Sequence, residues 1–227
     1  MANNVVDKLV AKLDEQTRVA IEARPETFRS RKLLLVGSEE SRYLKGVAAK
    51  AKKLGLLCEP YEERLDNDFR SFCAFDRETS EPWYEGAYYD LDCLWNPNDP
   101  SCTAEACLWV LEELKATEGV HVCMIGRGHA VKGLAERLLL RDATVTICHS
   151  KTNADGLRML TRVADITVNT ARTLHPYYHF APCAGSVLLD VSGSLSTWEC
   201  SNTITYVGPR DIGRLNISIL LNRFVNR

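Results

Sequence analysis

The segment Val120–Thr152, VHVCMIGRGHAVKGLAERLLLRDATVTICHSKT, decides the fold of this chain. Its first residues, 120–125, form a short apolar run that is typical of a buried parallel strand. After a glycine turn, apolar residues recur at helical spacing over 130–139, and residues 143–148 predict a second strand. A strand, a glycine turn, a helix and a strand in this order predict a mononucleotide-binding unit.

The turn of this unit is Gly126-Arg127-Gly128. Glycines there would let backbone N–H groups approach a pyrophosphate, and the start of the following helix favours its negative charge. The motif is incomplete, because the next glycine is Gly133, later than a G-x-G-x-x-G pattern requires. An ordinary tight turn between a strand and a helix therefore stays open as the alternative.

The end of the second strand indicates which cofactor the turn would hold. A protein that binds NAD usually places an acid there, on the ribose 2′-hydroxyl. Here residues 148–152 read C-H-S-K-T, which supplies a cation and two hydroxyls but no carboxylate, and the turn adds an arginine. Such a site suits a 2′-phosphate, so the sequence predicts NADP rather than NAD. The predicted cofactor-binding residues are Gly126, Arg127, Gly128, His149, Ser150 and Lys151.

The composition excludes several classes of function. The chain has 227 residues, of which 45% are hydrophobic and 26% charged, as in an ordinary globular protein. Its net charge of -2 gives no reason to expect nucleic acid or an anionic membrane as a partner. No apolar run reaches the length of a membrane span, and the acid-containing N-terminus is unlike a targeting peptide. The nine cysteines are scattered without zinc spacing, so we expect a reducing cytoplasm and no metal.

The rest of the chain predicts an α/β fold of two lobes. Helices are expected at 4–23, 41–54, 103–115 and 212–224, and further strands at 32–36, 56–61, 164–169 and 185–191. Pro25 is expected to end the first helix and Thr103 to cap the third. Residues 62–89 carry no readable pattern, and their aromatic cluster is interpreted as local core.

The domain boundaries follow from this order of elements. We expect a smaller α/β lobe over 1–102 and a Rossmann-like lobe with a mainly parallel sheet over 103–208. Residues 209–227 are expected to form a C-terminal helix that returns to the first lobe. Both terminal helices would then pack on that lobe.

Four stretches, which are spread over most of the chain, resemble the methylenetetrahydrofolate dehydrogenase/cyclohydrolase family. The most specific joins I-G-R-G at 125–128 to C-H-S-K-T at 148–152, similar to the family's I-G-R-S and C-H-S-[RK]-T. With a small slip in the turn, V-G-S-E-E-S-R-Y at 36–43 resembles its folate-side V-G-x-x-x-x-S-x-x-Y. D-L-D-C at 90–93 resembles D-V-D-G, and P-R-D-I-G-R-L-N at 209–216 resembles P-G-G-V-G-P-M-T. The chain looks like a shortened, divergent member.

The resemblance implies a two-lobed, usually dimeric protein with folate in the cleft and NADP on the second lobe. Arg127 and Ser150 would hold the 2′-phosphate. Tyr43 would contact the folate, and Asp92 would bind the pterin ring, since a carboxylate suits the donor edge of a 2-amino-4-oxopterin.

The departures from the family pattern concern the catalytic lysine first. The family places it four residues after the tyrosine on the same helix face, where this chain has Val47. Valine can neither activate water nor move protons, as a cyclohydrolase must. Lys50, one turn further on, is the candidate replacement, whereas Lys45 points elsewhere. The predicted catalytic residues are therefore Tyr43, Asp92 and Lys50. Hydride transfer demands less of the protein, because the nicotinamide carries the chemistry.

Other departures concern the substrate. The family's Q-L-P-L-P segment is not recognisable before Asp90, and Arg214 replaces the second proline of its C-terminal segment. Arg210 and Arg214 either bind a glutamate tail or are solvated surface charges, which is the commoner case.

The histidines do not predict a metal site. His175 and His179 have a spacing that suits a metal on a helix, but Pro176 favours a loop and no third ligand is evident. His129, at the start of the nucleotide helix, is expected to be an exposed polar residue.

With its departures, the resemblance implies an NADP-dependent 5,10-methylenetetrahydrofolate dehydrogenase with weak or absent cyclohydrolase activity. It would be a cytoplasmic homodimer acting on a tetrahydrofolate derivative in one-carbon metabolism. Two alternatives stay open: a non-catalytic NADP- or folate-binding homologue, and a dehydrogenase of another small substrate.

Overall fold

The computed structural model describes residues 2–38, 40–60, 71–75, 88–93, 100–172, 182–195 and 204–227. The chain divides into two compact units. Unit 1 contains Met1–Leu9 and Thr103–Leu215, and unit 2 contains Val10–Cys102 and Asn216–Arg227. Within the described parts, no helix is both long enough and apolar enough to cross a membrane.

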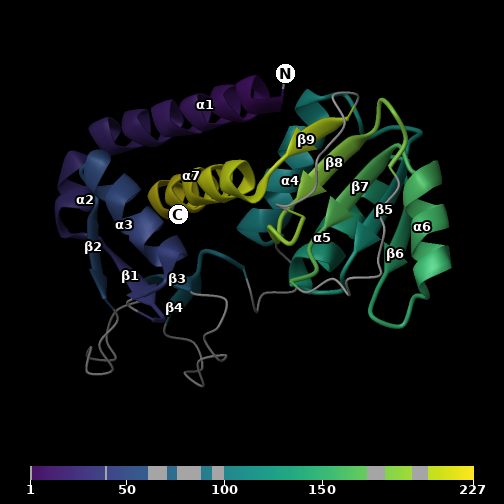
Figure 1. Cartoon of the computed structure of the whole chain (residues 1–227). Helices are drawn as coiled ribbons and strands as arrows, with labels where there is room; N and C mark the ends of the chain where they lie inside the picture. Colours follow the sequence, from purple (N-terminus) through teal and green to yellow (C-terminus); the bar gives the residue numbers. More distant parts are fainter. Residues whose placement is uncertain are drawn as a thin grey trace. The chain divides into compact units, whose positions relative to one another are not determined.

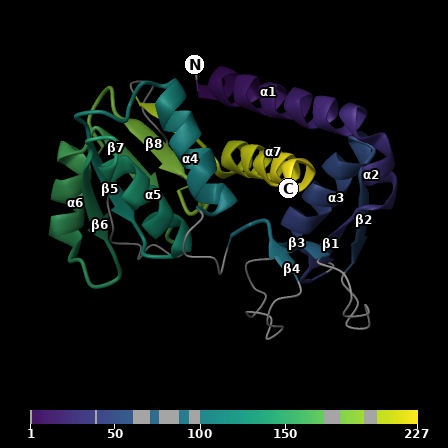
Figure 2. The ribbon, with the colours of Figure 1, turned by 180° about the vertical axis from the view of Figure 1, so that it is seen from behind.

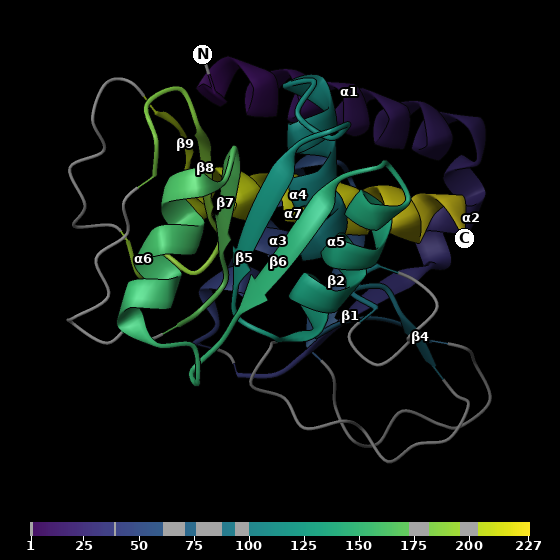
Figure 3. The same ribbon diagram turned by 90° about the vertical axis from the view of Figure 1, so that its right-hand side faces the viewer.

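Unit 1 is built on a parallel sheet with the strand order β6-β5-β7-β8-β9, whose strands lie side by side in Figure 3. The strands are β5 (His121–Ile125), β6 (Thr144–Cys148), β7 (Ile166–Asn169), β8 (Val187–Asp190) and β9 (Thr205–Val207). The helices that accompany them are α4 (Cys102–Glu113), α5 (His129–Leu139) and α6 (Ala154–Val163). All of β7 and most of β5 are buried, as expected for a parallel sheet covered on both faces.

The chain reverses its direction across this sheet at β5. It passes from β5 to β6 on one side and then returns to β7 on the other side of β5. Right-handed crossovers therefore place α5 and α6 on opposite faces of the sheet (Figure 1). The carboxyl ends of β5 and β7 form a topological switch point, which is where open parallel sheets bind ligands.

Unit 2 contains a parallel sheet with the order β2-β1-β3-β4. Its strands are β1 (Lys32–Val36), β2 (Leu57–Pro60), β3 (Ser71–Phe75) and β4 (Tyr88–Asp90). Its helices are α2 (Pro25–Ser30), α3 (Arg42–Lys53) and the later parts of α1 (Ala2–Ala23) and α7 (Pro209–Asn226). Ser41 caps α3 by accepting a hydrogen bond from the backbone N–H of Leu44.

The end of α7 is anchored in the core of unit 2. Phe224 is fully buried and meets Phe72 edge-on, with ring centroids 5.4 Å apart. Arg24 donates a hydrogen bond of 2.7 Å to the carbonyl oxygen of Val225, and Asn222 donates one of 3.3 Å to Thr17 on α1. Both terminal helices thus pack on the first lobe, and the predicted two-lobed α/β class is confirmed.

Several local predictions need correction. Pro25 follows the end of α1 but also starts α2, because its fixed φ suits the first turn of a helix. Thr103 lies inside α4, which begins one residue earlier. Among the described residues, five elements were not predicted: α2, β3, β4, α6 and β9. Of the unreadable stretch 62–89, only 71–75 and 88–89 lie within the described residues, and β3 there occupies a central place in the sheet.

Candidate functional site

The switch point of unit 1 brings three strand ends together. Ile125, the last residue of β5, is in register with Cys148 of β6 and Asn169 of β7. Gly126 then donates a backbone hydrogen bond of 2.9 Å to Cys148, and Thr170 donates one of 2.9 Å to Ile125. The predicted glycine turn and the predicted C-H-S-K-T segment are therefore neighbours at the carboxyl edge of the sheet.

The two glycines of the turn have different reasons to be glycine. Gly126 has φ +119°, and a Cβ there would lie 2.2 Å from Thr170 Oγ1, so neither the backbone nor the space admits a side chain. Gly128 has φ −70°, and a Cβ there would meet nothing within 4 Å. It stands before α5, whose first turn no side chain caps. This open, N–H-rich position fits the phosphates of a dinucleotide.

The rim of the turn is positively charged and hydroxylated. Arg127, Ser150 and Lys151 are all exposed. The segment that carries the last two is held by its own backbone: His149 N donates to Thr152 Oγ1 at 3.0 Å, and Lys151 N donates to His149 Nδ1 at 3.1 Å. His149 thus shapes the turn through its ring, and the neighbouring hydroxyl and ammonium groups remain accessible to a ligand.

His129 corrects one expectation. It begins α5 and is half-buried rather than exposed, and its Nε2 atom has no hydrogen-bond partner among the described residues. A buried ring nitrogen without a partner is uncommon in proteins, so it marks the start of α5 as a place where a polar ligand group would be stabilised.

The thiols below the turn behave as core residues, as expected. Cys123 and Cys148 are buried, and their Sγ atoms are 3.8 Å apart. The hydrogen bond to Cys148 and burial raise the pKa of Cys123, while the hydrogen bond from Cys123 lowers the pKa of Cys148. No group of His, Cys, Asp or Glu within the described ranges could hold a metal, and His175 and His179 lie outside them.

A buried polar network at the ends of β7 and β8 was not anticipated. Asn169 Nδ2 lies 2.9 Å from Asp190 Oδ1, and both residues are fully buried. Asp190 also accepts hydrogen bonds from Ser192 Oγ and from the backbone of Gly193. Asn169 Oδ1 in turn accepts a hydrogen bond from the backbone N–H of Ala171, which follows Thr170, the neighbour of Gly126. The available signal was a polar residue closing each of two apolar strands.

The polar pair of unit 2 comes from segments far apart in sequence. The phenol of Tyr43, in the first turn of α3, donates to Asp92 Oδ1 at 2.6 Å. Asn216 Oδ1, on α7, lies 3.3 Å from the same phenol. Asp92 and Asn216 are buried, and Tyr43 is half-buried. The structure therefore brings together the two residues that the sequence singled out for folate, and it adds Asn216.

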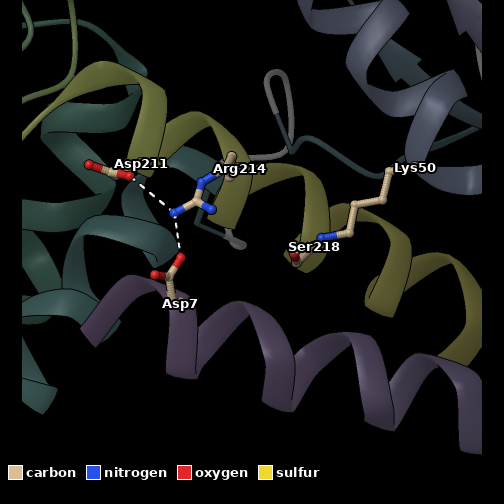
Figure 4. A network of polar contacts seen from close by, with 5 residues as sticks. All are labelled: Asp7, Lys50, Asp211, Arg214 and Ser218. Carbon is tan, nitrogen blue, oxygen red and sulfur yellow. Dashed lines mark hydrogen bonds and ion pairs between the residues drawn. The ribbon is translucent and has the colours of Figure 1, made fainter. Parts of the chain in front are cut away.

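The structure gives different surroundings to the three positions that the sequence analysis considered for the family's lysine. Val47 is fully buried. Lys50 Nζ donates a hydrogen bond of 2.5 Å to Ser218 Oγ (Figure 4). It also lies 2.7 Å from Asp14 Oδ1, so its charge is paired inside unit 2. Lys45 forms a surface ion pair with Glu40, as its predicted direction implied.

Arg214 is engaged by carboxylates of its own chain. Its guanidinium lies 2.8 Å from Asp7 and 3.1 Å from Asp211, and the hydrogen bond with Asp7 raises its pKa (Figure 4). Arg210 is exposed. These contacts favour the surface-charge interpretation over a site for a glutamate tail.

Comparison with known proteins shows the family of this chain. The family model for the NAD(P)-binding domain of tetrahydrofolate dehydrogenase/cyclohydrolase matches residues 101–197. The bifunctional protein FolD of Dictyoglomus thermophilum is 30% identical over 209 residues, which cover 85% of this chain and 70% of that protein. The chain belongs to the tetrahydrofolate dehydrogenase/cyclohydrolase family. The resemblance predicted from the sequence is thereby confirmed.

Other members of the family show how far the similarity extends. FolD of Thermosipho africanus is 43% identical over 103 residues, but the match covers only 43% of this chain and 37% of that protein. The fold is similar throughout. The Trypanosoma brucei methylenetetrahydrofolate dehydrogenase-cyclohydrolase, solved with NADP and an inhibitor, has a TM-score of 0.71 at 18% identity, over 99% of this chain and 95% of that chain.

The turn of this family member can be tested with two alanine variants. We expect Gly126→Ala to lower the free energy of unfolding by about 1–3 kcal/mol, because it strains the backbone and crowds Thr170. Gly128→Ala should leave stability nearly unchanged but weaken dinucleotide binding, since its methyl group would enter the open space before α5. Urea denaturation and calorimetric titration with NADP measure the two effects. Equal NADP affinity of the Gly128→Ala variant and the unaltered protein would show that the cofactor does not use this space.

Proposed function

We propose that this protein is an NADP-dependent 5,10-methylenetetrahydrofolate dehydrogenase with weak or absent cyclohydrolase activity. Unit 1, with residues 103–208, would bind the nucleotide, and unit 2, with most of residues 1–102, the folate. The observation that carries the proposal is the combination of two features of α3. Tyr43 and Asp92, the residues that the resemblance assigns to folate, are joined by a hydrogen bond, while the family's lysine position is a fully buried valine, Val47.

The choice of NADP rests on the strand end in unit 1. Arg127, Ser150 and Lys151 are exposed there, and the segment contains no carboxylate that would repel a 2′-phosphate. The uncapped start of α5 supplies N–H groups for the pyrophosphate. When bound, the nicotinamide would accept the hydride. The protein would chiefly have to align two rings and exclude water.

The folate side would rely on hydrogen bonding. Asp92 is buried and accepts a hydrogen bond from the phenol of Tyr43. A carboxylate at this position suits the amino edge of a pterin, which carries hydrogen-bond donors. Lys50 is the candidate amine for proton transfer, but its ion pair with Asp14 would first have to break. This cost supports weak or absent hydrolysis of the methenyl product.

We also propose that the protein is a cytoplasmic homodimer, as the family resemblance implies. Every cysteine within the described ranges is a free thiol, which suits a reducing compartment. Light scattering of the purified protein would decide the oligomeric state, and a monomer at cellular concentration would contradict it.

The activity itself is tested by mixing the protein with methylenetetrahydrofolate and either NADP or NAD. We expect NADPH to form, with a kcat/KM for NADP at least about ten times that for NAD, because the 2′-phosphate would meet Arg127. Arg127→Ala should remove most of that preference. Arg158→Ala, which removes an exposed arginine from α6, is the matched control.

Each other outcome of this assay supports a different function. NADP binding without turnover would indicate a non-catalytic homologue. Turnover only with other substrates would indicate another dehydrogenase. Equal rates with NAD and NADP would contradict the role proposed for the strand end.

The role of Val47 is tested by restoring the lysine. We expect Val47→Lys to raise hydrolysis of methenyltetrahydrofolate from a low base, because an amine would return one turn after Tyr43. Val47→Met adds similar length without an amine and should not raise it. Thermal melts of both variants separate this gain from the cost of filling a buried position. Efficient hydrolysis by the unaltered protein would show that Val47 does not limit the reaction.

A further inference from the structure

The turn that carries Asp92 has an unusual backbone. Leu91, Asp92 and Cys93 follow β4 and are all buried. Cys93 has φ +52°, in the left-handed region that favours glycine, and it stands where the family's D-V-D-G segment has glycine. A side chain there makes this conformation less favourable, so the turn depends on contacts from outside it.

Arg223 supplies such contacts from α7. Its Nη1 atom donates to the carbonyl oxygen of Leu91 at 2.9 Å and lies 3.1 Å from Cys93 Sγ. Its Nη2 atom donates to the carbonyl oxygen of Pro100 at 2.8 Å. The guanidinium therefore contacts both neighbours of Asp92, Leu91 and Cys93, and also Pro100. A planar guanidinium directs its N–H donors to several acceptors in a fixed geometry, whereas the ammonium group of lysine is a point charge on a flexible stem.

The same helix contacts the other member of the polar pair. Asn216 is seven residues before Arg223, about two helical turns, so both side chains lie on similar faces of α7. Asn216 Oδ1 lies within hydrogen-bond distance of the phenol of Tyr43, and Arg223 donates a hydrogen bond to the turn that contains Asp92. Figure 2 shows α7 beside α3, the helix that carries Tyr43.

We propose that Arg223 is a positioning residue that holds Asp92 in the geometry needed to bind the pterin ring. The part of this inference that concerns the pterin rests on the function proposed above. Without Arg223, the strained turn relaxes and Asp92 leaves the phenol of Tyr43. Folate binding then weakens, while the nucleotide turn in unit 1 keeps its structure.

The first experiment tests the turn itself, whatever the protein binds. Native protein is treated with iodoacetamide, and alkylation of Cys93 is followed by mass spectrometry. We expect Cys93 to be protected in the unaltered protein and to react at least about ten times faster in Arg223→Met and Arg223→Lys. Arg24→Met is the matched control, because it removes an arginine-to-carbonyl bond from the same end of α7 without touching the turn. Its Cys93 should stay protected.

The second experiment tests the role in folate binding. For Arg223→Lys we expect the KM for methylenetetrahydrofolate to rise about tenfold or more, with the KM for NADP unchanged; Arg24→Met should change neither. Titration with 5-formyltetrahydrofolate gives the same comparison without turnover.

The outcomes separate the two proposals. Protection of Cys93 in both Arg223 variants would overturn the inference, and so would exposed Cys93 with unchanged folate affinity. If Arg223→Lys keeps both the folate affinity and the protection of Cys93, then a positive charge suffices to hold the turn and the planar guanidinium is not needed. This result would also contradict the inference. If the unaltered protein neither turns over nor binds folate, the proposed function fails, and Cys93 labelling still decides whether Arg223 holds the turn.

Discussion

The arrangement of unit 2 depends on one set of hydrogen bonds, those between α7 and the turn that follows β4. The turn contains a left-handed cysteine and a buried carboxylate, and neither is favourable without partners. Arg223 donates hydrogen bonds to the carbonyl oxygens of Leu91 and Pro100, and Asn216 Oδ1 lies near the phenol of Tyr43, the partner of Asp92. The core around Phe224 fixes α7 in turn, so apolar packing at its end determines the polar geometry two turns earlier.

The candidate nucleotide site of unit 1 differs from the polar pair of unit 2, because it consists mostly of backbone groups. Gly126 can adopt its conformation only without a side chain, and it is pressed against Thr170 at the switch point of the sheet. The buried network of Asn169 and Asp190 holds the loop on that side. An uncapped helix start beside the exposed cations Arg127 and Lys151 suits an anionic cofactor, because its free N–H groups and the positive charges favour phosphate.

The proposed loss of the family's lysine is consistent with the way charge is distributed in unit 2. A buried valine at position 47 removes a group that could exchange protons, and the nearby ammonium of Lys50 is tied to Asp14. What remains around Tyr43 can accept and donate hydrogen bonds, so it favours recognition over proton transfer. Hydride transfer tolerates such a change better than hydrolysis does, because the cofactor supplies the reacting group.

The sequence alone determined the class of the fold and located the nucleotide turn, and its family motifs singled out Tyr43 and Asp92, because each has a local pattern or a motif of recognisable order. The hydrogen bond between Tyr43 and Asp92 is visible only in the structure. Apolar periodicity located most strands, and glycine with C-H-S-K-T located the turn. Only the tertiary structure decided the rest. β3 lies in a stretch without periodicity, and Asn216, Ser218 and Arg223 look like ordinary polar residues of a helix. Each of them contacts a partner more than a hundred residues away in sequence: Tyr43, Lys50 and the turn of Asp92, respectively. No local sequence pattern encodes such contacts.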